Sequence, residues 1–558
     1  MSSASPAKSK RRTTLAARGE PLIWLLGAGQ VVASLMILGL LLFVLVKGFA
    51  TFWPRPIELV ETTSGAQYLG EITRSDSFRP VQAADSGHPV EMVDRRLVRT
   101  GNYDLYGDDF KWVLDSEIAA STHPADAVAI ERLEWGPFVG FVEEYKSAGQ
   151  TIGGDRETAW TAFQERHTGV RSLWKEIKGL ERGELGAVFG QINELRLSVR
   201  RVELKHGKAS AEYAAAVAEA DRSRARLLEQ SEEIGGRIAQ LRARMEQDVL
   251  VLTEIGGVRK ELPVYAVVRA YRANQLSLAN RLKIYFSRWW EFMSDEPRES
   301  NTEGGVFPAI FGTVLMTLIM ALVVTPFGVV AALYLREYAK QGFIVSAVRV
   351  AVNNLAGVPS IVFGVFGLGF FCYLVGGTID SIFYPEYAPS PKYGTQGLIW
   401  ASLTLALLTL PVVIVATEEA LSAVPRSLRE AGYACGASKW QVIRMVVLPK
   451  AMPGIMTGVI LAMARGAGEV APLMLTGVVK LAPELPISGE FPFIHFERSI
   501  MHLGFHIYDL GFQSRNAEAA KPMVFTTALL LICVIVLMNV FVISLRTRLK
   551  RKLTSGYF

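Results

Sequence analysis

Six stretches of the chain are long and apolar enough to cross a lipid bilayer, and this feature limits the fold more than any other. A spanning helix needs roughly 20 apolar residues. Inside a bilayer the backbone must satisfy its own hydrogen bonds, which favours helices. The sequence therefore predicts an all-α membrane region of six transmembrane helices, at about 23–46, 309–335, 345–376, 397–416, 454–478 and 523–545.

Composition supports a membrane protein that carries a soluble region. The 558 residues are 50% hydrophobic and 20% charged, with a mean hydropathy of +0.26. The net charge of +6 does not indicate nucleic acid, because the basic clusters lie at the chain ends beside apolar segments, where anionic membrane lipid is the expected partner. The first stretch exceeds the roughly 7 to 15 residues of a signal core, so we expect a retained anchor.

The distribution of Lys and Arg predicts the orientation of the helices. Both tails, 1–22 and 546–558, are basic, and so is the connection 417–452. The segment 479–522 carries slightly more acidic than basic residues. Because positive loops remain inside, we expect a multi-pass protein of the inner (cytoplasmic) membrane with both termini in the cytoplasm.

On this topology, residues 54–305 form one extracytoplasmic insertion between the first two helices. Short runs such as "QYLGEI" and "FKWVL", separated by Gly, Pro and Asp, predict a β-rich module at about 55–155. From about 165 to 255 the apolar spacing becomes helical, and Gly207 marks the expected turn of an antiparallel hairpin. A plain helical hairpin and a true coiled coil both fit this pattern. The three cysteines lie outside the insertion, at Cys372, Cys435 and Cys533, so no disulfide links it.

The basic connection 417–452 predicts two short helices. Pro425 is expected to begin the first and Gly436 to end it, while Trp440, Ile443 and Val447 share a face of the second. Two helices joined at a glycine form a compact protrusion that a partner can hold. An ordinary amphipathic loop lying on the membrane is the other interpretation.

The fifth apolar stretch contains Arg465 and Glu469 in "ARGAGEVAPL". Each charge costs about 2.5 to 3.5 kcal/mol near the centre of a bilayer. In a continuous helix they share one face and neutralise each other, so they form either a structural ion pair or an oxyanion site. In the second interpretation Glu469 holds Arg465 or exchanges a proton with the substrate. Gly466, Gly468 and Pro472 permit a bend there.

The third stretch carries a face of small residues in "NNLAGVPSIVFGVFG". Gly357, Ser360, Gly364 and Gly367 recur at intervals of three and four, which favours close helix packing, and Pro359 predicts a kink. The seven histidines show no ligand spacing. We expect no metal site, and His495, His502 and His506 are predicted to be surface residues.

The connection 417–452 resembles the EAA loop of ABC importer permeases. The matching residues are Glu430, Ala431, Gly432, Gly436, Val446, Leu448 and Pro449, with Gly432 and Val446 standing where the family usually has Ala and Ile. The resemblance implies that this loop docks on a separate ATPase. The sequence contains no G-x-x-x-x-G-K-[ST]. We therefore expect no enzyme and no cofactor in this chain, with ATP and Mg bound by a cytoplasmic ATPase dimer.

With "NLAGVPSIVFGVFG" and "ARGAGEVAPLMLTG", residues 305–550 resemble the phosphate-specific ABC importer permeases of the PstA type. The resemblance implies a type I permease core at 306–545, phosphate translocation involving Arg465 and Glu469, and three partners. These are a homologous second permease, the ATPase dimer and an extracytoplasmic phosphate-binding protein.

Two other functions stay open at this point. One is a permease for another oxyanion, such as sulfate or molybdate, because an arginine suits them all. The other is a membrane-anchored sensor or scaffold. The insertion 54–305 has no counterpart in the usual family pattern, where this region is short. It is expected either to dock the binding protein or to act as a spacer or a wall-facing domain.

Overall fold

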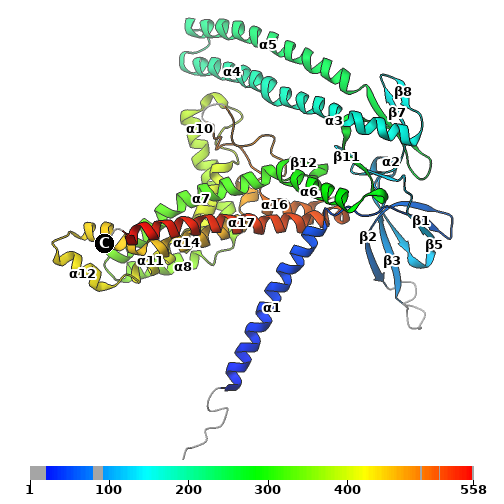
Figure 1. Cartoon of the computed structure of the whole chain (residues 1–558). Coiled ribbons are helices and arrows are strands. Elements are labelled where there is room, and N and C mark those ends of the chain that lie inside the picture. The colour runs from blue at the N-terminus through cyan, green and yellow to red at the C-terminus, as the bar shows by residue number, and fades with distance from the viewer. Residues whose placement is uncertain (1–19, 79–91, 490–492, 515, 556–558) are drawn as a thin grey trace, which may run out of the picture.

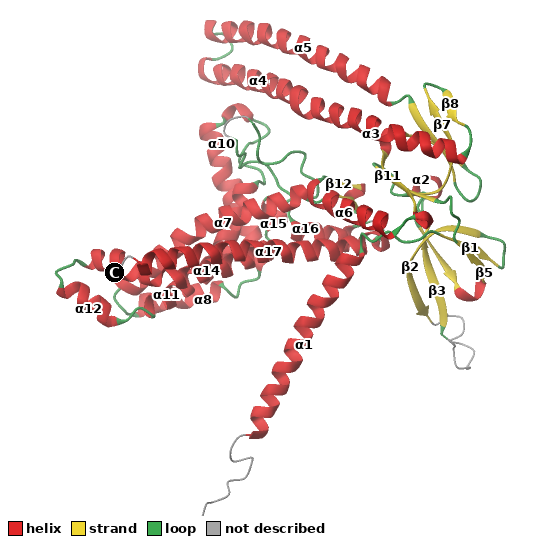
Figure 2. Cartoon of the chain, in the orientation of Figure 1, coloured by secondary structure: helices red, strands yellow, loops and turns green. Residues whose placement is uncertain are grey.

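The computed structural model describes residues 20–78, 92–489, 493–514 and 516–555, and the predicted basic cluster from Lys8 to Arg18 lies outside them. Within the described part, six helices are long and apolar enough to span a membrane, as the sequence predicts. They are Ile23–Ala50, Phe307–Tyr338, Ser360–Phe383, Leu398–Ser422, Lys439–Gly468 and Ala517–Arg548. Strands gather at one end of the molecule, in the insertion (Figure 2).

The insertion begins with a five-stranded antiparallel sheet. Its strands follow the order β4-β3-β2-β1-β5 and comprise β1 (Glu58–Thr62), β2 (Gln67–Phe78), β3 (Val93–Arg99), β4 (Phe110–Leu114) and β5 (Ile118–Thr122). A short helix, α2 (Tyr103–Tyr106), links β3 to β4. Val60, Val98 and Val113 are buried together on one face of this sheet. Alternating apolar residues therefore build this half of the module.

A second sheet, of six strands, is completed by strands on both sides of the helical hairpin. The order is β10-β9-β7-β6-β11, with β8 on β7, from β6 (Val128–Arg132), β7 (Phe138–Ser147), β8 (Gln150–Gly153), β9 (Asp248–Thr253), β10 (Arg259–Pro263) and β11 (Val267–Arg272). The hairpin is thus an excursion from one β module, and strands continue after it, beyond the β-rich range predicted at 55–155.

The hairpin itself consists of α3 (Arg156–Leu180), α4 (Gly186–His206) and α5 (Ala211–Met245). A π-helical turn, Glu181–Leu185, joins α3 and α4 into one long arm. Asp155 caps the start of α3 through its side chain, and Gly207 ends α4 with a φ of 81°, which a glycine adopts without strain. Figure 1 shows the arm reaching from the sheets back over the membrane helices.

Two helices connect the insertion to the bundle. The helix α6 (Leu278–Ser294) leads through the short pair β12 (Pro297–Arg298) and β13 (Glu303–Gly304) into α7 (Phe307–Leu333). The N-terminal helix α1 (Glu20–Ala50) contacts α17 (Ala517–Ser555) at its C-terminal end, where a Cβ at Gly48 would lie 2.9 Å from Leu529. Away from this contact α1 diverges from the bundle (Figure 1).

The bundle is centred on α11 (Leu398–Ser422), which packs against α7 and α14 (Leu448–Gly468). Met316, Met320, Leu405 and Ala462 are buried in its core. Buried hydroxyl groups donate to the carbonyl four residues earlier, as Thr313 does to Ala309 and Thr404 does to Trp400. These bonds satisfy polar side chains where no water is available.

Two predicted spans have the wrong limits. Residues 345–376 do not form one helix, because α8 (Phe343–Leu355) ends before Pro359 and a separate span, made of α9 (Ser360–Phe366), a π-helical stretch and α10 (Gly377–Phe383), begins after it. The residue before a proline avoids helical geometry, which explains the break. The span predicted at 454–478 begins earlier, at Lys439, and ends at Gly468.

Candidate functional site: a broken transmembrane helix and its cytoplasmic loop

The fifth span is interrupted within the bundle. The helix α14 ends at Gly468, Glu469 has extended geometry (φ −77°, ψ 140°), and a short helix, α15 (Leu473–Thr476), follows Pro472. Glycine disfavours helix and proline cannot donate a backbone hydrogen bond, so the local sequence permits this break. Irregular backbone at membrane depth occurs where it is covered by protein or lines a polar path.

Arg465 and Glu469 flank this break and form an ion pair. The Nε atom of Arg465 lies 3.6 Å from Oε1 of Glu469, and the two side chains are 36% and 21% exposed. Neither has another ion pair within the described residues. The prediction that they share the face of a continuous helix is wrong, because Glu469 follows the last helical residue; they still come together.

The break lies at mid-depth in the bundle. Gly466 packs so closely on α7 that an added Cβ would lie 2.6 Å from the methyl group of Met320, which is at the middle of that helix. Arg465 is the preceding residue. A charge at this depth is expensive, and such residues usually face a polar route through the protein.

Other predicted packing residues also meet at the break. An added Cβ at Gly364 would lie 2.7 Å from Cα of Pro472, and one at Gly367 would lie 2.2 Å from Oγ1 of Thr404. Gly364 therefore lets α9 approach the broken segment. Gly357, by contrast, lies in the turn before α9 rather than on a helix face, and Pro359 precedes α9 as its cap instead of kinking a continuous helix.

The connection 417–452 folds as the predicted pair of helices. The helix α12 (Arg426–Ala434) begins after Pro425, Gly436 turns the chain with a φ of 78°, and α13 (Lys439–Val442) begins with a capping box between Ser438 and Gln441. A π-helical turn, Ile443–Val447, continues α13 into α14. The loop and the fifth span are therefore one mechanical element.

The outer surface of this loop is left uncovered. Glu430, Ala431 and Gly436 are exposed, whereas Val446, Leu448 and Pro449 are half-buried where the helix enters the bundle. Trp440 is 53% exposed, whereas Ile443 and Val447, which are predicted to share its face, are buried. Val442 occupies that buried position instead. An exposed tryptophan adds a large apolar surface for a partner.

Gly432 has a steric role in the loop. An added Cβ there would lie 2.9 Å from Cγ2 of Val442 on the second helix, closer than side chains normally approach. Gly432, where the EAA loop usually has alanine, thus lets the two loop helices pack closely.

Arg429 anchors the loop to the second span. It donates to Glu337 at 2.6 Å and to the Leu421 carbonyl at 2.7 Å, and Glu337 is largely buried. Sequence reasoning missed this contact, because its partners lie 92 residues apart. The only sequence signal is the charged end of the second apolar stretch, "LYLREY".

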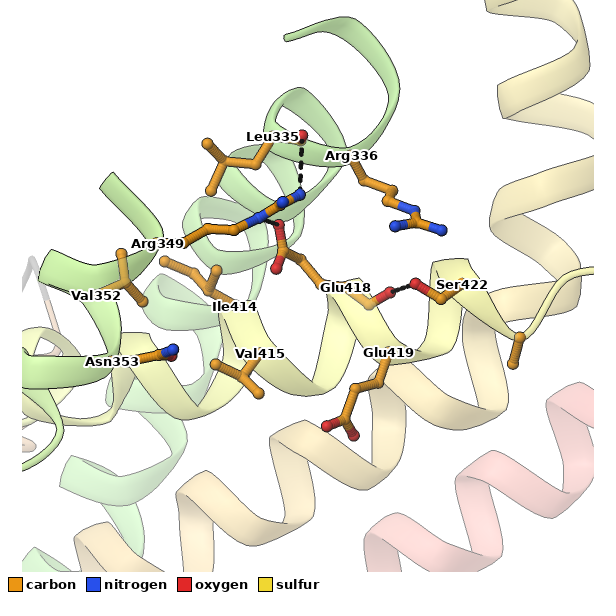
Figure 3. Close-up of a pocket in the computed structure, with 11 residues that line it drawn as sticks. Leu335, Arg336, Arg349, Val352, Asn353, Ile414, Val415, Glu418, Glu419 and Ser422 are labelled. Carbon is orange, nitrogen blue, oxygen red and sulfur yellow. Dashed lines mark hydrogen bonds and ion pairs between the residues drawn. The ribbon is translucent and has the colours of Figure 1, made fainter. Parts of the chain in front are cut away.

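A cavity of about 650 Å³ opens beside this anchor, among α7, α8 and α11 (Figure 3). Arg349 crosses it and approaches Glu418 at 3.4 Å and Gln341 at 3.0 Å. Arg336 has no ion pair within the described residues, and its guanidinium lies apart from both glutamates in Figure 3. The cavity lining is Leu335, Arg336, Arg349, Val352, Asn353, Ile414, Val415, Glu418, Glu419, Ser422 and Ala423.

Two histidines predicted to be at the surface are buried. His502 is fully covered and His506 is 2% exposed, and burial lowers the pKa of each to about 4. His502 caps the start of α16 (Leu503–Tyr508) and His506 lies within it. This helix lies beside the break, since an added Cβ at Gly504 would lie 2.8 Å from Val470. His495 is also mostly covered, at 13% exposure of its side chain. Within the described residues no group of three His, Cys, Asp or Glu side chains suits a metal ion.

Comparisons with known proteins relate the bundle to transport permeases. The family described as "binding-protein-dependent transport system inner membrane component" matches residues 305–555. The probable ABC transporter permease protein YqgI of Bacillus subtilis (strain 168) is 30% identical over 272 residues, which cover 48% of this chain and 86% of that protein.

Two phosphate transport system permease proteins are also similar. PstA of Mycobacterium leprae (strain TN) is 38% identical over 34% of this chain and 56% of its own length. PstA of Pasteurella multocida (strain Pm70) is 30% identical over 43% of this chain and 75% of its own length. The chain thus spans little more than half of the M. leprae protein and three quarters of the P. multocida protein.

Proposed function

This chain belongs to the family of binding-protein-dependent transport inner membrane components, and from that premise we propose that it is the permease subunit of an ATP-driven importer of inorganic phosphate. It is a multi-pass transport subunit of the cytoplasmic membrane rather than an enzyme. The names of the two PstA relatives support phosphate as the substrate.

The observation that carries the proposal is the charge pair at the broken helix. In the described part of the chain Arg465 makes one polar contact, to Glu469 at 3.6 Å, so most of its donors are available for an oxyanion. Phosphate offers the planar guanidinium two oxygens in matching geometry. Glu469 holds the arginine between transport events and is displaced, or takes up a proton, when the anion arrives.

The cytoplasmic loop is the proposed docking site of the ATPase. Glu430, Ala431 and Gly436 face outward, and the loop continues through Val446, Leu448 and Pro449 into the helix that ends at Arg465 and Glu469. Movement of the loop is thereby transmitted along α14 to the charge pair. The partner, which is an ATPase dimer, binds ATP and Mg and hydrolyses the ATP.

The complete importer includes a homologous second permease and an extracytoplasmic phosphate-binding protein. We propose that both termini lie in the cytoplasm. For the C-terminus, the position of the C-terminal end of α17 at the same end of the bundle as α12 supports this (Figure 1). The insertion lies at the opposite end, on the side of the binding protein. Its hairpin touches the core where Arg201 donates to Glu386 at 2.9 Å.

The test is uptake of labelled phosphate by phosphate-starved cells that lack this gene. The cells are rescued with the wild-type chain, Arg465→Gln, Arg465→Lys or, as a matched control, Arg336→Gln in the cytoplasmic cavity. We expect uptake from the wild type and the control and background uptake from Arg465→Gln. Arg465→Lys retains the charge but not the planar guanidinium, and its uptake is expected to lie between that of the wild type and that of Arg465→Gln.

Assembly is checked by co-purification of the ATPase. Gly436→Pro is expected to lose the ATPase, because proline cannot adopt the positive φ of this turn. If Arg465→Gln assembles and transports as the wild type does, the charge pair is structural and the mechanism fails. If the wild type restores sulfate or molybdate uptake instead, the substrate assignment is wrong but the permease assignment holds.

A further inference from the structure

A second polar cavity, of about 410 Å³, lies where the insertion meets the extracytoplasmic ends of α1 and α17. Its upper wall comes from β2, β3, β6 and α6, and its lower wall from the last turns of α1 and the first turns of α17. These elements converge at one junction in Figure 1. The cavity is remote from the broken helix, and the transport mechanism proposed above does not use it.

The walls of this junction cavity differ in chemistry. Toward the membrane they are apolar and partly aromatic, and they include Ala50, Phe52, Trp53, Met523 and Phe525. The lining as a whole also carries seven basic and five acidic side chains, so cations are in excess. The basic residues are Lys47, Arg55, Arg74, Arg99, Arg288, Arg298 and Lys521, and the acidic ones are Glu71, Glu131, Glu291, Glu303 and Glu518.

Most of the deep charges are already satisfied. Arg288 donates to Glu131 at 2.8 Å, to the Phe52 carbonyl at 3.0 Å and to the Tyr271 hydroxyl at 2.6 Å. Arg99 pairs with Glu303 at 3.1 Å. These groups hold the junction together and leave little capacity for a ligand.

The cations near the membrane are less committed. Lys47, in the last turn of α1, has no ion pair within the described residues, and the Arg55 guanidinium meets only the carbonyls of Ile72 and Thr73, through one nitrogen. Lys521 shares Glu518 with Arg74. Glu71 makes no ion pair with any of them within the described residues, and burial raises the pKa of its carboxyl despite Arg288, Arg99 and Arg55 nearby.

We propose that the junction cavity binds the phosphate group of an anionic phospholipid of the outer leaflet, with Lys47, Arg55 and Lys521 as its cationic partners. A basic rim above an aromatic floor, at the end of two spanning helices, matches the headgroup region of a bilayer. The acyl chains run along α1, whose side chains from Ile23 to Phe49 are largely exposed. Free phosphate would match the basic side chains of the cavity but has no apolar part to contact its apolar wall.

The bound lipid adds to the direct contacts that join α1, α17 and the insertion. The Thr51 hydroxyl donates to the Pro522 carbonyl at 3.1 Å, and Phe43 packs edge-on against Phe525. A headgroup in the cavity adds charge-assisted bonds between these elements. The site is independent of the transported substrate, and either proposal can fail without the other.

The test is a titration of the full-length chain, stripped of lipid in a neutral detergent, followed by native mass spectrometry. The probes are dihexanoyl-phosphatidylglycerol, dihexanoyl-phosphatidylcholine and inorganic phosphate. We expect one saturable adduct with phosphatidylglycerol and weaker binding of the other two. In Lys47→Gln/Lys521→Gln the affinity for phosphatidylglycerol falls about 25-fold, at roughly fivefold for each removed charge.

The matched control is Lys175→Gln/Lys205→Gln, which removes two lysines from the hairpin, far along the chain from the cavity and without ion pairs within the described residues. It is expected to bind phosphatidylglycerol as the wild type does. A second variant, Ala50→Trp, fills the apolar wall and is expected to weaken the adduct without changing the charge. Equal binding by all variants overturns the site, and equal binding of phosphatidylcholine overturns the anionic preference. If the double variant loses affinity for inorganic phosphate but not for phosphatidylglycerol, the ligand is free phosphate and the proposal of a lipid is wrong.

Discussion

Two arginine–glutamate pairs in this molecule are chemically alike and structurally opposite. In the insertion, Arg288 contacts Glu131 at 2.6 Å and also donates to a backbone carbonyl and a tyrosine hydroxyl, with both charged side chains 17% exposed. In the bundle, Arg465 reaches Glu469 at 3.6 Å and has no other hydrogen bond or ion pair within the described residues.

The difference shows that a charged side chain whose hydrogen bonds are complete has a structural role, whereas one with unused donors is available for function. A buried ion pair repays its desolvation only when further hydrogen bonds complete it, and Arg288 meets this condition. Glu131 reflects it: burial alone would raise its pKa, but Arg288 and Arg269 outweigh burial and lower the pKa to about 2. Arg465 lies at membrane depth with spare donors, which is costly unless a ligand uses them.

The largest expected effect on transport comes from the incomplete pair. Arg465→Gln is expected to reduce phosphate uptake at least 100-fold, about 2.7 kcal/mol of lost stabilisation of the transported anion, while thermal unfolding in detergent changes by less than about 1 kcal/mol. Uptake and unfolding are measured on the same preparations. If Arg465→Gln instead lowers the thermal stability and its folded fraction still transports phosphate, the Arg465–Glu469 pair is structural, as the Arg288–Glu131 pair is.

The complete pair should behave in the opposite way. Arg288→Gln leaves Glu131 buried with one cation fewer and is expected to destabilise the insertion by about 3 to 5 kcal/mol. Hydrogen exchange of β6 and β11 in the full chain measures this loss. The exposed Lys283→Gln on the same helix is the control and is expected to change nothing. Unchanged exchange in Arg288→Gln would show that the network is not structural.

Buried histidines extend the comparison to groups that are buried without a charge partner. Because burial lowers the pKa of His506 from its usual 6.5 to about 4, the unfolded chain binds a proton first as pH falls. Stability is therefore full above pH 6.5 and is lost between pH 6.5 and 4, by about 2 kcal/mol from pH 7 to pH 5. Unfolding midpoints against pH measure this slope.

His506→Leu is expected to remove about half of the slope that the two buried histidines produce together, since the pKa of His502 is also lowered to about 4, while the exposed His206→Leu keeps the whole slope. Glu131 acts in another window, since its depressed pKa gives stability that is present above pH 4.5 and lost as pH falls toward 2. A slope confined to the lower window in both variants would mean that His506 is protonated in the fold.

The smallest effect is expected from a pair that lies between the two extremes. Arg201 on the hairpin is 60% exposed, but its partner Glu386 in the core is 3% exposed. Arg201→Gln is expected to cost about 1 kcal/mol, because water retains access to one side of the pair. Hydrogen exchange of the Glu386 and Tyr387 amides measures the local loss of protection, and Arg201→Lys should restore part of that protection. A loss as large as that of Arg288→Gln would place this contact with the structural pairs.

Much of the candidate site was predictable because its signals are local. Gly436 and Pro425 limit the loop helices through their own backbone preferences, and the spacing from Glu430 to Pro449 is a property of the chain alone. Arg465 and Glu469 stood out for the same reason, as charges in an apolar run. Their true geometry was not predictable, since the break after Gly468 depends on contacts with Met320 and on the approach of Gly364 to Pro472.

By itself the sequence determined the six apolar spans, the two-helix loop before the fifth span and the presence of a large polar insertion, because hydrophobicity and turn chemistry act over neighbouring residues. Only the tertiary structure decided where the fifth helix ends, which charges are completed, and that β9 to β11 close a sheet begun before the hairpin. The burial of His502 and His506 was decided in the same way. These features depend on contacts between residues far apart in the chain, and burial free energy is a property of the packed surroundings rather than of the residue.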